Sequence, residues 1–484
     1  MKQPAAIVWF RQDLRLDDNP ALEAAVKSGK PVVPVFIWDP DSEGDWSPGA
    51  ASRSWLHFAL KKLDKSLRAV GSRLVLHEGP TLECLEKLID DTSADSVFWN
   101  RRYEPAVIAR DTKIKTELSK RGLHVESFNA MLLFEPWTVK TKTATPYKVF
   151  TPFYRACLSQ PEPDDPISAP QKLKSPGKWP TSAKLESLKL LPRIHWDTGI
   201  REAWRLDEPE ESSLIDRFVQ QGLAGYPEAR DRPDVDGTSR VSPYLHSGEL
   251  SPRRLWHAVR AATRRPKTGP PPKAAEGYLR ELIWREFAYH LLFHFPKTVS
   301  EPLNAGFAKF AWRKDAGGLK AWQKGQTGYP IVDAGMRQLW TTGWMHNRVR
   351  MIVGSFLVKD LLLPWPEGAK WFWDTLVDAD LANNTLGWQW VAGCGADAAP
   401  FFRIFNPIRQ GEKFDPEGNY VREWVPELSK LPDRWIQKPW EAPESILKDA
   451  GIDLGRTYPQ RLVDHDEARA RALEEFKKSR ETAE

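Results

Sequence analysis

Short apolar runs alternate with longer amphipathic segments from residue 5 to about residue 130. The runs AAIVWF, PVVPVFIW, RLVLHE and DSVFWN have the length of buried strands. The segments between them, such as SRSWLHFALKKLDKSLRAV, repeat their apolar residues at helical spacing. Because this alternation is typical of a doubly wound, mainly parallel sheet, we predict an α/β domain over residues 1–133.

The first strand-to-helix turn of this predicted domain carries no dinucleotide motif. It reads FRQDLRLDDNPAL and contains no G-x-G-x-x-G. A Rossmann-type cofactor site is therefore not expected at this turn.

Residues 134–204 are rich in Pro, Lys and Ser and show few periodic apolar positions. That composition predicts a connector that runs over the surface between two domains. From residue 205 to residue 484 helical patterns dominate, which predicts an all-α C-terminal domain. Its last part, HDEARARALEEFKKSRETAE, is typical of a solvated terminal helix.

Two stretches of the predicted helical domain break the regular periodicity. GYPIVDAGMRQLWTTGWMHNRVRM and residues 378–407 interleave tryptophans, amides, acids and arginines. In the second stretch Asp378 and Asp380 lie among apolar residues, and the amides Asn383 and Asn384 follow. Aromatic planes, amide edges and fixed charges together suit a large, planar, polar ligand.

Composition narrows the class of protein. A chain of 484 residues exceeds one typical core, so two or three domains are expected, and 41% hydrophobic with 28% charged residues is typical of a soluble globular protein. A net charge of +5 permits a polyanionic partner. The three cysteines show no C-x-x-C spacing, so we expect neither a metal site nor a disulfide, which fits a reducing cytoplasm. The apolar run at the N-terminus is too short for a signal peptide, and we expect no membrane span.

The sequence resembles the photolyase and cryptochrome family. The runs DLANNTLGWQW, GADAAPFFRIFNP, TGYPIVDAGMRQL and GWMHNRVRM carry this resemblance, which extends from about residue 5 to about residue 428. Within the family the chain looks most like the cyclobutane pyrimidine dimer (CPD) photolyases. The spellings NTLGWQW and AGCGADAAP look like the bacterial class III group, with class I as the alternative.

The resemblance implies a lyase that repairs UV-damaged DNA with FAD and works as a monomer without an obligate protein partner. In the family the fully reduced FAD anion, excited by blue or near-ultraviolet light, passes an electron to the CPD, the ring splits, and the electron returns. The segment GAASRSWLHFAL and RRYEP around Glu104 look like class III and plant-cryptochrome patterns, which implies a methenyltetrahydrofolate antenna. Deazaflavin, or no antenna, stays open.

The resemblance also implies roles for individual residues. Glu281, Asn384 and Met351 match catalytic positions, and Trp312, Trp365 and Trp388 match a tryptophan triad that carries electrons to the flavin. Flavin contacts match Tyr226, Thr238, Ser239, Arg240, Val241, Ser242, Glu281, Arg285, Trp344, Asn347, Arg350, Asp378, Asp380 and Asn384. Contacts to the lesion and to DNA match Arg230, Trp284, Arg348, Trp390, Arg403 and Lys413, and Glu104 matches the antenna site.

Each of these residues also has an ordinary structural interpretation. The hydroxyls near Ser251-Pro252 can cap a helix, and each tryptophan can be a core residue. Glu281 and Arg285 can form a surface ion pair, and Glu104 can be an acid at a helix start.

Three other functions remain open on the sequence. A cryptochrome photoreceptor is disfavoured by Asn384, where plant cryptochromes typically have an acid, and by Trp284, Trp390 and Met351. Repair of the six-four photoproduct is disfavoured because its enzymes carry a histidine pair where this chain has His346-Asn347. The third is a non-enzymatic flavoprotein or aromatic-rich binding module.

Overall fold

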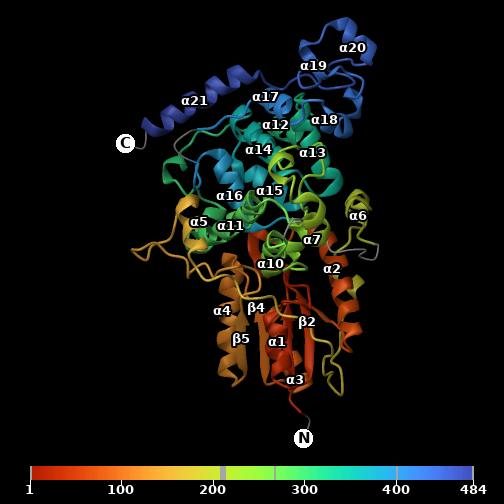
Figure 1. Ribbon diagram of the computed structural model, residues 1–484, viewed down its shortest axis with the longest axis vertical. Helices are drawn as coiled ribbons and strands as arrows, with labels where there is room; N and C mark the ends of the chain where they lie inside the picture. The colour runs from red at the N-terminus through yellow and green to blue at the C-terminus, as the bar shows by residue number, and fades with distance from the viewer. Residues whose placement is uncertain (1–2, 208–213, 266–268, 399–401, 482–484) are drawn as a thin grey trace.

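The computed structural model describes residues 3–207, 214–265, 269–398 and 402–481. An α/β domain with a parallel sheet forms one end of the molecule, and a helical domain forms the other (Figure 1). The predicted fold class, an α/β doubly wound N-terminal domain followed by an all-α C-terminal domain, is therefore confirmed. The domain limits that we assign from the sequence stay a prediction.

The sheet has five parallel strands in the order β3-β2-β1-β4-β5. The strands are β1 (Ala6–Phe10), β2 (Val32–Trp38), β3 (Val75–Glu78), β4 (Ser96–Asn100) and β5 (His124–Phe128). Helices α1 (Pro20–Lys27), α2 (Ala50–Ala69), α3 (Thr81–Thr92) and α4 (Pro105–Lys120) connect or cover them. Alternate residues of β1 face two different cores, Val8 and Phe10 one and Ile7 and Trp9 the other, which explains the continuous apolar run.

The helical part is built around the long helix α11 (Pro272–His294), which contacts α5, α10 and α16. Because α11 carries apolar residues on several faces, it is buried between its neighbours. The other helices are α5 (Phe150–Leu158), α6 (Thr198–Trp204), α7 (Leu214–Arg217), α8 (Tyr226–Ala229), α9 (Ser242–Ser247), α10 (Pro252–Thr263), α12 (Ala316–Gln323), α13 (Pro330–Thr342), α14 (Asn347–Ser355), α15 (Trp365–Thr375), α16 (Leu381–Ala392), α17 (Pro407–Phe414), α18 (Asn419–Trp424), α19 (Asp433–Ile436), α20 (Glu444–Ala450) and α21 (His465–Glu481). Short 3-10 and π turns are η1 (Pro40–Trp46), η2 (Leu185–Leu188), η3 (Phe218–Gly222), η4 (Pro296–Val299), η5 (Ala305–Phe307), η6 (Phe356–Asp360), η7 (Pro426–Leu428) and η8 (Pro439–Glu441).

The segment 134–204 does more than connect the two domains, which differs from our expectation. Its helix α5 inserts Phe150 and Phe153 into the core beneath α11, and Leu173 and Leu188 enter the core of the α/β domain. These apolar residues are irregularly spaced because each extends from non-repeating backbone into a separate core. No sequence periodicity therefore reveals them.

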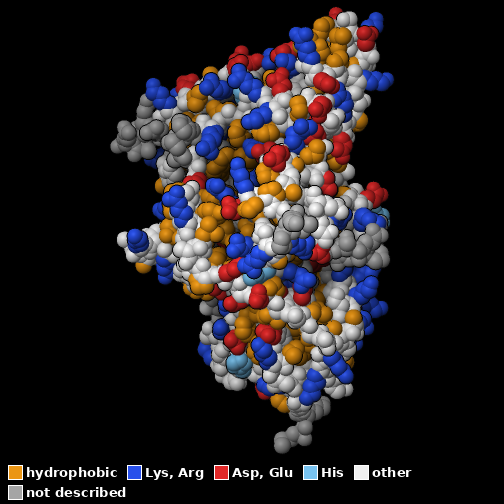
Figure 2. Space-filling view, in the orientation of Figure 1, with side chains coloured by type: hydrophobic (Ala, Val, Ile, Leu, Met, Phe, Trp, Pro, Cys, Tyr) orange, Lys and Arg blue, Asp and Glu red, His pale blue; other side chains and the backbone are white. Residues whose placement is uncertain are grey.

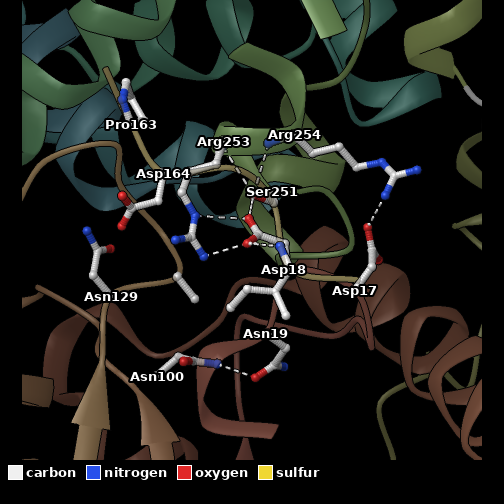
Figure 3. Close-up of polar contacts among 12 residues, drawn as sticks. Asp17, Asp18, Asn19, Asn100, Asn129, Pro163, Asp164, Ser251, Arg253 and Arg254 are labelled. Atoms are coloured by element: carbon white, nitrogen blue, oxygen red, sulfur yellow. Dashed lines mark hydrogen bonds and ion pairs between the residues drawn. The ribbon is translucent and has the colours of Figure 1, made fainter. Parts of the chain in front are cut away.

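A buried polar cluster joins the two domains (Figure 3). Asp18, which follows β1, accepts hydrogen bonds from the Ser251 hydroxyl and from Arg253 of α10. Next to it Asp17 pairs with Arg254, with 2.8 Å between Oδ2 and Nη1. Ser251 also accepts from the backbone N–H of Arg253, which confirms the predicted helix cap. These contacts fix the carboxyl edge of the sheet against α10.

Candidate functional site

Two connected cavities open into the helical domain. The larger has a volume of about 690 Å³ and the smaller about 310 Å³. Seven residues line both of them: Arg230, Glu281, Asn347, Arg350, Asp378, Asp380 and Asn383. On the face drawn in Figure 2, Lys and Arg side chains alternate with apolar side chains over the helical domain. The two cavities together have the size and mixed lining of a ligand site.

The smaller cavity gathers almost all of the residues that we predict to contact a flavin. It is lined by Tyr226, Thr238, Ser239, Arg240, Val241, Ser242, Glu281, Arg285, Trp344, Asn347, Arg350, Asp378 and Asp380. Asn384 lines the larger cavity instead. Helices α8, α9, α11 and α14 contribute about half of these side chains. The loop 238–241, Trp344, Asp378 and the α16 cap Asp380 contribute the rest, so a sequence span of more than 150 residues converges on one site.

Two cationic side chains in the smaller cavity have buried donors without a partner in the described part of the chain. The Arg240 guanidinium lies between the Trp204 and Trp344 rings, 4.8 and 5.0 Å from their centroids, and its Nε is unpaired. Arg285 donates from Nη1 to the Met131 carbonyl at 2.6 Å, and its Nη2 is unpaired. Because buried N–H groups are costly to leave unpaired, this cavity fits a ligand with anionic or carbonyl oxygens.

The two acids Asp378 and Asp380 are buried, as their apolar neighbours indicate. Asp378 pairs with Arg350, whose Nη2 lies 2.8 and 3.0 Å from the two carboxylate oxygens. Asp380 caps α16 by accepting from the Asn383 N–H at 2.8 Å, and it also accepts from the Tyr289 hydroxyl. Both acids are therefore held in fixed positions at the junction of the two cavities.

The Asn384 side chain is oriented by the backbone of α15. Its Nδ2 donates to the Ala369 carbonyl at 3.0 Å, while the residue lines the larger cavity. Because the amide nitrogen is engaged by α15, the amide oxygen is the group available to accept a hydrogen bond from a ligand.

The larger cavity has an aromatic lining. Trp284, Trp390 and Met351 all contribute to it. Phe150 of α5 stacks on the Trp284 ring at 3.5 Å with planes 6° apart. Phe150 therefore covers one face of Trp284 and fixes its plane, which leaves an indole surface for stacking in the cavity.

Glu281 forms an ion pair that the sequence does not indicate. Its Oε1 accepts from Arg230 Nη1 at 2.7 Å. The alternative interpretation of Glu281 and Arg285 as a surface ion pair is wrong. Arg285, four residues further along the helix, is buried and donates to the Met131 carbonyl.

The side chains that we predict to contact DNA lie at or near this cavity. Arg348 lies over the Phe414 ring at 4.4 Å and pairs with Asp231, with 2.9 Å between Nη2 and Oδ1. Lys413 does not line either cavity but lies over the same Phe414 ring, at 5.0 Å. The exposed Arg403 lies over the Trp390 ring at 5.2 Å.

His346 lies next to these cations. Its Nδ1 accepts from the Arg348 N–H at 3.2 Å, and the residue is almost fully buried. Burial lowers the pKa of His346 to about 4, with the nearby Arg348 and Arg350 acting in the same direction. His346 is therefore neutral near pH 7 and orients the start of α14.

The three predicted electron-transfer tryptophans share one apolar core. Trp388 lines the larger cavity and packs on Gly368 of α15, where a Cβ atom would lie 2.1 Å from the indole. Trp365 begins the same helix one turn earlier, and Trp312 packs against that core and is half-buried. The three indoles therefore belong to or border one apolar core, and their role in electron transfer stays a prediction.

A third, small cavity of about 70 Å³ lies at the carboxyl ends of β1 and β2. Trp9 Nε1, Arg11 Nε, Gln12 Oε1 and His246 Nδ1 line it without a hydrogen-bond partner in the described residues. The predicted antenna residue Glu104 does not line this cavity. It lies behind Arg102, which pairs with Glu104 at 2.9 Å and with Glu43 at 2.6 Å. Glu104 is also the residue before α4, so its interpretation as a helix-start acid stays open.

Several residues of the site have no sequence signal of their own. Phe150 lies in the segment that we predict to be a connector, and we predict no role for Asp231 or Asp397 from the sequence. Asp397 lines the larger cavity and accepts from the Phe150 N–H at 3.0 Å. Gly368 is the exception, because a glycine inside an amphipathic helix often indicates close packing, here against Trp388.

Comparison with known proteins places this site in a family. Residues 278–478 match the family described as FAD binding domain of DNA photolyase, and residues 6–171 match the family described as DNA photolyase. A deoxyribodipyrimidine photo-lyase of Agrobacterium fabrum is 51% identical over 98% of this chain and 98% of its own length. Cryptochrome-1 of Arabidopsis thaliana is 42% identical over 97% of this chain and 70% of its own length.

A solved structure agrees with this relationship. A bacterial class III photolyase from Agrobacterium tumefaciens superposes with a TM-score of 0.93 and 49% identity, over 99% of this chain and 98% of that chain. The chain therefore belongs to the photolyase and cryptochrome family, as the sequence predicts, and its FAD-binding domain supports FAD as the cofactor. No helix of the described residues has the length and apolar character needed to span a membrane.

Proposed function

We propose that this chain is a class III photolyase that repairs cyclobutane pyrimidine dimers in DNA under blue light. The observation that carries the proposal is the connection of the two cavities through shared residues such as Glu281 and Asn383. The residues that would hold a flavin line both cavities, as Arg240 and Arg285 line the smaller one and Asn384 lines the larger one, so they would hold it next to a dimer bound in the larger cavity. When bound, reduced FAD supplies the light-excited electron that splits the dimer.

The chain's own residues hold the flavin. Arg240 and Arg285 offer unpaired buried donors to its oxygens, and the hydroxyls of Thr238, Ser239 and Ser242 line the same cavity. The Asn384 amide oxygen is free to accept a hydrogen bond from a ring nitrogen, and a neutral amide cannot release a proton there.

The larger cavity accepts the lesion. A dimer must leave the duplex to reach it, and this is least costly for a base pair that is already damaged. Trp284 and Trp390 supply stacking surfaces, Met351 supplies an adaptable apolar contact, and Glu281 donates a hydrogen bond to a base carbonyl.

The cations around the opening bind the flanking phosphates. Arg230, Arg348, Arg403 and Lys413 carry this role, and contacts of this kind are independent of base sequence. Trp312, Trp365 and Trp388 bring electrons from solvent to the flavin site when the cofactor needs reduction.

The antenna is proposed as methenyltetrahydrofolate near the small cavity of the α/β domain. The four unpaired polar atoms of that cavity can hydrogen-bond one edge of such a ring system, although the cavity of about 70 Å³ is too small to enclose it. Glu104 contributes through Arg102, to which it is paired. We also propose that the protein works as a monomer in the cytoplasm.

The test is an anaerobic repair assay. Photoreduced protein is mixed with a duplex that carries one thymine dimer, and recovery of intact thymine under blue light is scored against a dark control. Light-dependent recovery supports the proposal. Absence of recovery from a protein that binds and photoreduces FAD would instead favour a cryptochrome-type photoreceptor, the second candidate, given the 42% identity to Cryptochrome-1.

A further inference from the structure

The Arg230–Glu281 ion pair stands at the junction of the two large cavities. Both side chains line both cavities, and Nη1 lies 2.7 Å from Oε1. About a third of each side chain is exposed, 29% for Arg230 and 35% for Glu281, so a ligand can reach the pair.

In the proposed function Arg230 and Glu281 each have a role that their ion pair prevents. Glu281 has to donate an O–H to a base carbonyl, but here its carboxyl accepts from a guanidinium. An adjacent cation favours the ionised carboxylate, and a carboxylate has no proton to donate. Arg230 has to hold a phosphate, but here its guanidinium is bound to Glu281. A change of partner is therefore needed before either can act.

No other cation near Glu281 is positioned to take the place of Arg230. Each has an arrangement of its own: Arg240 lies between two indoles, Arg285 donates to the Met131 carbonyl, Arg348 pairs with Asp231, Arg350 pairs with Asp378, and Arg403 lies over Trp390. If Arg230 leaves, Glu281 loses its only ion-pair partner in the described part of the chain.

The other titratable groups around Glu281 do not change charge near neutral pH. Burial raises the pKa values of Tyr226 and Tyr278 above their ordinary range, and burial lowers those of His246 and His346. The acids on the facing wall are engaged by other groups: Asp231 by Arg348, Asp378 by Arg350, Asp380 by Tyr289, and Asp397 by the Phe150 N–H.

We propose that Arg230 controls the protonation of Glu281, so that binding of a DNA phosphate to Arg230 is coupled to uptake of a proton by Glu281 from solvent. The phosphate replaces Glu281 as the partner of the Arg230 guanidinium. The Glu281 carboxyl then remains beside the base carbonyl and is stabilised in its protonated form. Arg230 is then a positioning residue that acts through Glu281. This inference deepens the proposed function and rests on it.

The coupling has a definite sign. Binding that increases the proton affinity of one group must itself be strengthened by protons. Affinity for a lesion-containing duplex is therefore higher at low pH and falls as pH rises, with a slope of at most about one decade per pH unit.

The experiment measures proton uptake on binding, in the dark, with the FAD-loaded full chain. Titration calorimetry with a thymine-dimer duplex is run in two buffers of different ionisation enthalpy, which yields the number of protons taken up. We expect uptake of a sizeable fraction of one proton, up to about one, for the parent. Glu281→Gln should take up none. Arg230→Met should take up less than the parent, because no guanidinium then has to release the carboxylate on binding.

Glu427→Gln is the matched control. It removes an acid that pairs with Arg337 away from both cavities and leaves the Arg230–Glu281 pair intact. Its proton uptake should equal that of the parent. Equal uptake in the parent and Glu281→Gln, or lesion binding by the parent without uptake, would overturn the coupling while repair under light continues to support the proposed function. A protein that does not bind the lesion duplex would overturn both.

Discussion

The cavity of the α/β domain and the cavities of the helical domain meet at His246, which lines both sides, but the α/β cavity and the larger helical cavity are built in opposite ways. Around the larger helical cavity three arginines are already paired, as Arg230–Glu281, Arg348–Asp231 and Arg350–Asp378. In the α/β cavity single polar atoms of Trp9, Arg11 and Gln12 are unpaired. A ligand in the larger helical cavity must exchange these partners, whereas a ligand in the α/β cavity gains partners, as it does at the unpaired Arg240 and Arg285 donors of the smaller helical cavity.

The largest effect is expected from a methyl group placed beside Trp388. In Gly368→Ala the new Cβ would lie 2.1 Å from the buried indole, which has to move. Because electron transfer depends on close, fixed geometry, photoreduction of the oxidised flavin should slow by roughly tenfold or more. Flash absorption spectroscopy measures it. Gly277→Ala in α11 is the control, since its new methyl meets no atom within 4 Å apart from its neighbours in the helix, and Gly277 lines neither cavity.

Changes at Glu281 test the lesion side of the paired cavity. Glu281→Gln should keep part of the repair yield, because an amide N–H can still donate to a base carbonyl, and Glu281→Ala should lose more. The quantum yield of repair is measured for both with FAD fully reduced. Equal yields would contradict the hydrogen-bond role of Glu281.

Removal of one paired cation should weaken DNA binding by a smaller amount. Arg348→Ala should reduce affinity about tenfold and lower the slope of log affinity against log salt by about 1. Fluorescence anisotropy across a salt series measures both quantities. Arg254→Ala at the domain junction is the control and should change neither. An unchanged slope in Arg348→Ala would show that this face does not hold phosphate.

The unpaired cavity should respond to loss of one acceptor. Gln12→Leu removes the unpartnered Oε1, so antenna chromophore affinity should fall about fivefold while FAD content stays constant. The ratio of antenna to flavin absorbance in purified protein measures this. Gln12→Glu keeps acceptor oxygens and should retain more antenna, and a chromophore content indifferent to both changes would place the antenna elsewhere.

The smallest effect concerns stability where the segment 134–204 meets α11. His290 donates from one ring nitrogen to the Pro136 carbonyl at 3.1 Å and accepts from the Tyr147 N–H at 3.0 Å, so only its neutral form fits. Burial lowers the pKa of His290 to about 4. Because the unfolded chain binds this proton near pH 6.5, stability present above pH 6.5 is lost as pH falls towards 4, about 2 kcal/mol by pH 5.

Denaturant titration of His290→Gln at pH 5 and pH 8 checks this prediction. The variant should be less stable than the parent at pH 8 but should lose less on acidification. His124→Gln, at a largely exposed position, is the control and should follow the parent. An unchanged pH dependence in His290→Gln would show that another group governs acid stability.

The sheet domain could be predicted because its signals are local. Strands β1, β2 and β4 are apolar runs buried on both faces, and their parallel pairing follows from the intervening helices. The edge strand β5, HVESF, is only partly buried, and no apolar run predicts it. Helix α5 could not be predicted in the same way. Its apolar residues are explained only by α11, which lies more than 100 residues further along the chain.

The sequence by itself determined the fold class, the family, and which aromatic and charged residues meet, since the two irregular stretches of the helical domain line one site. Only the tertiary structure decided which partner each charge takes. Spacing along α11 brings Arg285 within reach of Glu281, yet Glu281 pairs with Arg230. Folding buries Arg285 against the Met131 carbonyl and places α8, which carries Arg230 at its end, beside α11. Local spacing limits the partners that a side chain can reach, and the packing of distant helices selects among them.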